Sequence, residues 1–213
     1  MDIRASTDTV KIRINGQETP FNVSGISKVT DLIELIKAVI DPDHMISAFL
    51  LNGKELQDHE WNGMLAQLGT ATFEVETSTP ENYVGSRLMQ APELASTCYF
   101  QFRESRKLFQ EGKTIDANKN LVLAVSTLKE FFTWYATIIE LLTPERRKLV
   151  ELDEQMNGIT EVCKKICQQQ LYQSWWALGE SIKNELEPKL DSLEDACKKA
   201  LATFDASSIT GSN

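Results

Sequence analysis

The dipeptide Asn15-Gly16 constrains the fold of the first part of this chain more than any other feature. It lies between two segments in which apolar and polar side chains alternate. Residues 10–14 alternate apolar and charged side chains, Asn15-Gly16 follows them, and residues 21–23 resume the alternation. Asn and Gly both tolerate the positive φ angles that a type I′ turn requires. The sequence therefore predicts a β-hairpin at the start of the chain.

An amphipathic helix and further strands are predicted after this hairpin. Apolar residues recur at spacings of three and four over residues 32–40, and Asp41-Pro42 ends the pattern. The short apolar segment 45–51 runs into a second tight turn at Asn52-Gly53, and residues 71–76 alternate again. The predicted order is hairpin, helix, strand, short strand and closing strand.

The segment Leu50-Leu51-Asn52-Gly53-Lys54-Glu55-Leu56-Gln57-Asp58 resembles the strand-turn-strand segment of ubiquitin-like domains. The resemblance covers about residues 8–77, with the helix of residues 30–40 in register. It implies an α+β fold class with an N-terminal ubiquitin-like β-grasp domain over residues 1–78. Because no Gly-Gly follows the last strand, we expect a module that is not conjugated through its C-terminus.

The same resemblance points to three partner-binding residues on one face of the sheet. Leu50 holds the central aliphatic position of the face through which ubiquitin meets its receptors, whereas Glu74 and Glu76 replace a His and a Val. Buried unpaired carboxylates are costly, so we expect this face to bind a basic surface or another aliphatic patch. The alternative is that Leu50 packs against the helical domain or lies singly on the surface.

Apolar stripes with helical spacing fill the remainder of the chain. Residues 86–205 predict a bundle of three to four antiparallel helices, residues 79–85 read as a polar linker, and residues 206–213 are expected to be a disordered tail. Apolar residues recur from Leu149 to Leu186, including Leu171, and predict one long helix over residues 145–186, bent near Asn157-Gly158 or at the glutamine run 168–170. Glu187-Pro188 is expected to interrupt it again.

Tryptophans are the least routine feature of the helical part. Trp175 and Trp176 are adjacent, and Trp134 lies on the preceding predicted helix. Neighbouring residues on a helix point about 100° apart, so Trp175 and Trp176 cannot both face one narrow seam. These three residues are therefore further candidates for partner binding, and the alternative is a wide buried face.

Charge and composition indicate which kinds of partner and which cellular compartment are expected for this chain. The net charge is −9, and the residues before Pro80 carry six Lys and Arg against twelve Asp and Glu. No clustered basic stripe exists to displace counterions from a phosphate backbone, so nucleic acid is not expected as a partner. The N-terminus lacks a signal-peptide pattern and no stretch approaches about 18 apolar residues, so we expect a cytoplasmic protein without membrane insertion.

The sequence holds no recognisable catalytic or cofactor-binding motif. Cys98, Cys163, Cys167 and Cys197 occupy helical stripe positions without a Cys-x-x-Cys pair, which favours core thiols over a zinc site. No phosphate-binding loop or dinucleotide fingerprint is present. We therefore expect no enzyme activity and no cofactor.

Three hypotheses for function follow. The first is a protein-binding adaptor or scaffold with a built-in ubiquitin-like module, which docks a partner helix or a basic surface. The second is an assembly or secretion chaperone that shields a client helix. The third is self-association, as a homodimer, through the long helical seam.

Overall fold

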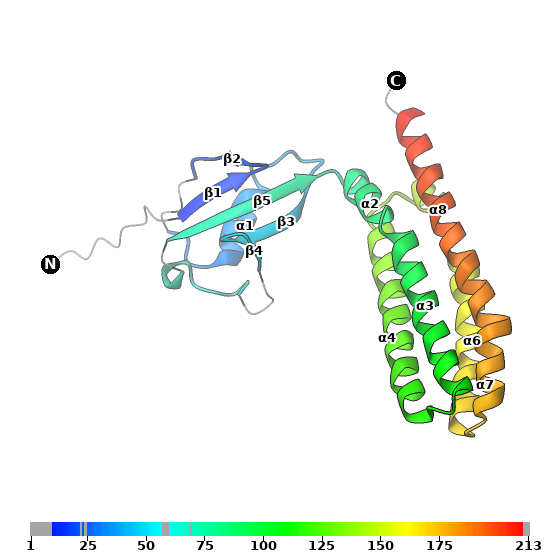
Figure 1. Cartoon of the computed structure of the whole chain (residues 1–213). Helices are drawn as coiled ribbons and strands as arrows, with labels where there is room; N and C mark the ends of the chain where they lie inside the picture. Colours follow the sequence, from blue (N-terminus) through cyan, green and yellow to red (C-terminus); the bar gives the residue numbers. More distant parts are fainter. Residues whose placement is uncertain (1–9, 22, 24, 57–59, 69, 211–213) are drawn as a thin grey trace. The chain divides into compact units, whose positions relative to one another are not determined.

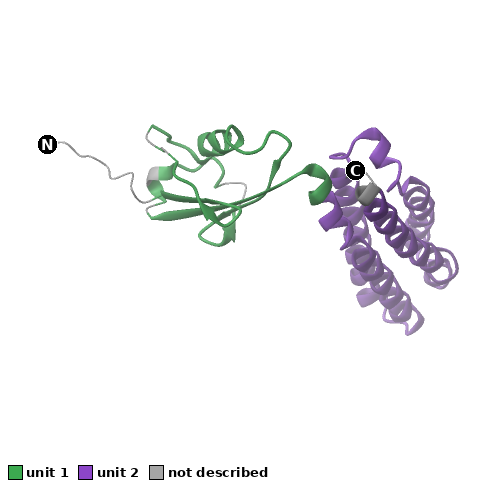
Figure 2. Cartoon of the chain, turned by 90° about the horizontal axis from the view of Figure 1, so that it is seen from above, with its two compact units in different colours: residues 1–83 green, residues 84–213 purple. Residues whose placement is uncertain are grey.

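A computed structural model describes residues 10–21, 23, 25–56, 60–68 and 70–210. The protein is α+β, with a five-stranded mixed sheet in the N-terminal part and helices in the remainder (Figure 1). It divides into two compact units, residues 1–83 and residues 84–213, coloured separately in Figure 2.

The sheet of unit 1 has the strand order β2-β1-β5-β3-β4. Strands β1 and β5 are parallel, and the other neighbours are antiparallel. The strands are β1 (Val10–Ile14), β2 (Gln17–Glu18), β3 (Met45–Leu51), β4 (Lys54–Glu55) and β5 (Ala71–Ser78). Asn15-Gly16 and Asn52-Gly53 have positive φ angles, between 50° and 78°, so both predicted tight turns are confirmed.

One helix packs on the core face of this sheet. Helix α1 (Val29–Lys37) presents Val29, Leu32, Ile33 and Ile36 as its buried side chains. Phe49, Phe73 and Val75 complete the core from the strands. The short η1 (Leu65–Gln67) links β4 to β5 and adds Leu65 to that core.

Unit 2 is built from long helices that alternate in direction (Figure 1). Helix α3 packs against α4 and α8, and α6 packs against α7 and α8. The helices that build or lead into it are α2 (Pro80–Leu88), α3 (Ala91–Gln110), α4 (Thr114–Ile139), α5 (Pro144–Arg147), α6 (Asp153–Leu171), α7 (Trp175–Ser181), the π-helical turn η2 (Ile182–Leu186) and α8 (Glu187–Thr210).

Two polar contacts join distant parts of this bundle. Arg106 Nε donates to Glu187 Oε1 at 2.6 Å, which ties α3 to α8. The hydroxyl of Tyr135 donates to the backbone oxygen of Val150 at 2.7 Å, and burial raises the pKa of this phenol. Both contacts satisfy buried polar groups that would otherwise destabilise the core.

Two expectations about the ends of the helical part need correction. The segment 79–85 is helical from Pro80, because Thr79 Oγ1 accepts a hydrogen bond from the Asn82 amide and Pro suits the first helical position. Residues 206–210 continue α8 and are not a disordered tail. Residues 211–213 lie outside the described part of the chain.

The predicted long helix is broken at other places than expected. Breaks lie between α5 and α6 and at Tyr172–Ser174, where Gln173 has a φ of 54°, whereas Asn157-Gly158 is helical throughout. Glu187-Pro188 does not interrupt the helix. The preceding turn widens to a π-helix, which moves the backbone carbonyl that a proline ring would otherwise strike.

Candidate protein-binding surface of the helical bundle

The turn between α6 and α7 is held by the glutamine run that precedes it. Gln169 Nε2 donates to Ser181 Oγ at 2.9 Å, and Gln170 Nε2 donates to Asn118 Oδ1 at 2.8 Å. The first bond ties the end of α6 to α7, and the second ties it to the first turns of α4. The glutamines therefore fix the turn in place at this end of the bundle.

The two adjacent tryptophans of α7 have opposite surroundings. Trp175 stacks on Phe109 of α3, with ring centroids 5.5 Å apart and an interplanar angle of 12°. Trp176 is 81% exposed. Trp175 therefore supports the core, and Trp176 is the one that a partner protein can reach.

Four large apolar side chains at this end of the bundle are more exposed than any others among the described residues. Ile115 is 75% exposed, Leu171 81%, Trp176 81% and Tyr172 82%. Ile115 lies in the first turn of α4, and the other three lie in or beside the α6–α7 turn at the same end (Figure 1). We call these four the tip residues. Exposed apolar side chains that gather in this way mark interaction sites in soluble proteins.

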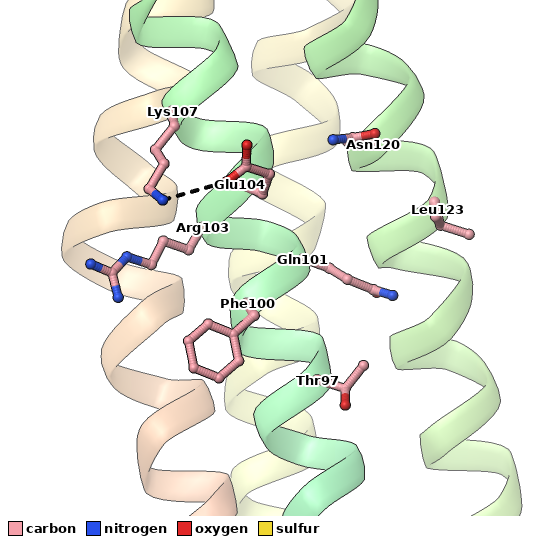
Figure 3. A pocket seen from close by; sticks show the side chains of 8 residues that line it. All are labelled: Thr97, Phe100, Gln101, Arg103, Glu104, Lys107, Asn120 and Leu123. Atoms are coloured by element: carbon pink, nitrogen blue, oxygen red, sulfur yellow. Dashed lines mark hydrogen bonds and ion pairs between the residues drawn. The ribbon is translucent and has the colours of Figure 1, made fainter.

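A shallow groove of about 580 Å³ lies between α3 and α4 (Figure 3). Phe100 of α3 and Leu123 of α4, each 58% exposed, are its large apolar side chains. Its remaining lining is Thr97, Gln101, Arg103, Glu104, Lys107 and Asn120. Figure 3 shows Gln101 pointing towards α4 and Asn120 pointing back towards α3.

The groove also holds polar atoms that have no hydrogen-bond partner in the described chain. Gln101 Oε1 and Arg103 Nε are both buried and unpaired. Glu104 and Lys107 pair with each other at 3.4 Å. Figure 3 shows Gln101 pointing towards α4 and Arg103 pointing away from it, so the two unpaired atoms do not face one common site.

Helix α4 links the groove to the tip residues. No charged residue occurs between Lys119 and Lys129, and Val122 lies exposed two turns after Ile115. Within the described chain, α4 is the one helix long and apolar enough to cross a membrane by length and composition, with a mean hydropathy of 1.2. Only 28% of that apolar window is buried in the bundle, so much of it faces outward.

The candidate residues on the sheet lie together on its open face. Leu50 of β3 is opposite Glu74 of β5, and Glu76 is opposite Ala48. Arg13 of β1 is opposite Glu74 on the other side, and Glu55 of β4 is opposite Leu50, so both strand neighbours of Leu50 at this position are acidic. Leu50 and Glu74 are half-buried, whereas Glu76 is exposed.

Trp134 is separate from the other two tryptophans. Its ring lies 5.9 Å from Phe131 and is half-buried. It follows Asn118 by 16 residues along α4, which corresponds to about 24 Å of helix. Trp134 is therefore not part of the tip.

Burial dominates the chemistry of three of the four thiols. It raises the pKa of Cys98 to about 11 and those of Cys163 and Cys197 to about 12, so all three are protonated at neutral pH. Cys167 is exposed. In the described part of the chain, no group of three His, Cys, Asp or Glu residues gathers as a metal site.

Sequence reasoning placed Leu171 on a buried seam and overlooked Ile115, Tyr172 and the groove. Leu171 is the last residue of α6, so the chain turns before its side chain can reach the core. A signal was present in the sequence, since residues 171–176 hold four large apolar side chains that fit no single helical stripe.

Comparison of the chain with known proteins returns nothing: no family model, no curated protein and no solved structure matches it.

Proposed function

We propose that this chain is a non-catalytic adaptor of the cytoplasm that binds another protein through the tip residues and the adjoining α3–α4 groove. The observation that carries this proposal is the exposure of all four tip residues at one end of a well-packed bundle. Burying each of them against a partner would contribute roughly 1.5–3 kcal/mol. Trp and Tyr are also the residues most enriched in binding hot spots.

Unit 1 is proposed to be a ubiquitin-like β-grasp module that is not conjugated. Supporting features are a hairpin followed by a helix, and a mixed sheet with parallel β1 and β5 at its centre. The chain continues from β5 directly into α2, which leaves no flexible Gly-Gly tail. The open face around Leu50 remains its candidate surface for a basic or aliphatic partner.

A chaperone function is the second candidate, and the α3–α4 groove favours it. Two helices with Phe100 and Leu123 between polar borders present the surface on which an amphipathic client helix can lie. Self-association is the third candidate, because the outward stripe of α4 could pair with its copy.

The test is affinity purification of the tagged chain from its own cells, as wild type, Trp176→Ala and Met89→Ala. Met89 is a matched control, because it is exposed at the opposite end of the bundle, between α2 and α3. We expect a stoichiometric partner that is lost with Trp176→Ala and kept with Met89→Ala.

Light scattering of the purified wild type separates self-association from the other two candidates. A dimer that dissociates with Trp176→Ala or Val122→Ser indicates self-association. Retention of the partner by the Trp176→Ala variant, with a monomeric wild type, would contradict a role for the tip.

A further inference from the structure

One half of strand β3 in unit 1 has a free edge. Strand β4 pairs with β3 only at Leu50 and Leu51, and the Leu56 amide extends this contact to the Phe49 carbonyl at 3.4 Å. Over residues 45–48, no strand among the described residues pairs with β3 on the side away from β5. An edge of this kind can accept a further strand through backbone hydrogen bonds.

An apolar pocket of about 540 Å³ lies beside this free edge, between β3 and the C-terminal half of α1. Its walls include the core residues Ile33 and Phe49, together with half-buried Ile40, Ile46 and Trp61. The rings of Phe49 and Trp61 stack at 5.9 Å. The pocket thus opens directly onto the apolar core of unit 1, with room for a large side chain.

A β-bulge brings the walls of the pocket together. The register of β3 against β5 shifts between Ile46 and Ala48. In a regular strand, Ile46 and Phe49 would point to opposite faces, because side chains alternate. The bulge inserts one residue, so that both side chains reach the core side and line the pocket.

The lining of the pocket includes one carboxylate, together with Lys37 and His44. This carboxylate belongs to Asp41, and one of its oxygens accepts the Asp43 amide at 3.0 Å, with no cation paired to it in the described chain. Lys37, the one Lys or Arg of the lining, is neutralised by Glu34 at 2.8 Å. A ligand with a basic side chain is therefore favoured next to Asp41.

We propose that the free edge of β3 and this pocket together bind an extended segment of a partner protein. The segment adds a strand along residues 45–48, inserts one large apolar side chain between Ile46 and Trp61, and places a Lys or Arg beside Asp41. This site lies in unit 1 and is independent of the tip residues.

The test is selection of linear 12-residue peptides from a random display library against the full chain. Enriched synthetic peptides are then titrated by fluorescence anisotropy. We expect them to share a large apolar residue near a basic one. Asp41→Lys should weaken their binding about tenfold, because charge reversal replaces attraction by repulsion. Glu74→Lys, the same reversal on the open sheet face, and Trp176→Ala should leave the affinity unchanged.

Two further measurements test the mode of binding. Ile46→Asp should remove detectable binding, and a circular dichroism spectrum checks that this variant is folded. N-methylation of the peptide at one set of alternating residues should weaken binding while the other set is tolerated, since only one set donates to β3. The proposal is overturned if no peptide is enriched, if Asp41→Lys binds as wild type does, or if both methylated sets bind equally.

Discussion

The two units bury their apolar side chains in different ways. In unit 1, one helix of nine residues packs on one face of a five-stranded sheet. In unit 2, helices of 19 to 26 residues pack along their length. The sheet core stays open at a pocket beside β3, whereas the bundle closes its core and leaves its remaining apolar residues outside.

Dimensions explain this difference. Helix α1 is about 14 Å long, and the outer strands of a five-stranded sheet lie about 19 Å apart, so one helix cannot cover the face. In unit 2, the long helices have similar lengths, so each can cover the apolar side of its neighbour along its whole length. Unit 1 is therefore suited to receive a side chain in a pocket, whereas unit 2 offers exposed side chains and a shallow surface groove to a partner.

Truncation of core phenylalanines should produce the largest difference in stability between the two units. Phe102→Ala in the bundle should lower the free energy of unfolding by about 4 kcal/mol, because its closed surroundings cannot collapse into the cavity. Phe49→Ala, beside the existing pocket, should cost less, about 3 kcal/mol. Urea unfolding measures both.

Phe100→Ala is the matched control on α3, and its exposed ring should contribute less than about 0.5 kcal/mol. An equal loss for Phe100→Ala and Phe102→Ala would contradict the closed core of the bundle.

Removal of one partner from an ion pair should produce the next largest difference in stability between the two units. Arg106→Met should destabilise the bundle by about 3 kcal/mol, because it leaves the Glu187 carboxylate buried without its partner. Lys37→Met breaks the exposed pair with Glu34 in unit 1 and should change stability by less than about 0.5 kcal/mol. Urea unfolding of the two variants tests this contrast, and similar losses for both would contradict it.

The ionisation of buried thiols at alkaline pH should produce the smallest change in the free energy of unfolding. This change is expected only in the bundle, because unit 1 contains no cysteine. The pKa values of Cys98 and Cys197 are raised by burial, so above about pH 9 these thiols ionise in the unfolded chain but not in the folded one. Stability is therefore lost as the pH rises. Between pH 8 and pH 10 we expect a loss of about 1 kcal/mol for each of these thiols.

Hydrogen exchange followed on individual peptides measures the stability of the two units separately. Cys197→Ala should reduce the loss between pH 8 and pH 10, while unit 1, whose residues include no cysteine, should not show this thiol component. An unchanged pH dependence in Cys197→Ala would contradict the role of that thiol.

Local features were read correctly from sequence where neighbouring residues decide them. The Asn-Gly turns, the alternating strands and the amphipathic helix of unit 1 each depend on backbone preferences or periodicity within a few residues. The helical stripes around Cys98, Phe102 and Leu128 depend on the same kind of signal. The helix at residues 80–88 was missed because its polar composition hides a capped start at Thr79 and Pro80.

The sequence by itself determined the order of the elements in unit 1, the two tight turns and the separation into a sheet part and a helical part. Only the tertiary structure decided that Trp176 and not Trp175 is exposed, that Arg106 meets Glu187 across 81 residues, and that β3 keeps a free edge beside a pocket. The physical reason is that these features depend on contacts between residues far apart in the sequence. Periodicity fixes which side of a segment is apolar, whereas exposure depends on how long the neighbouring elements are and where they end.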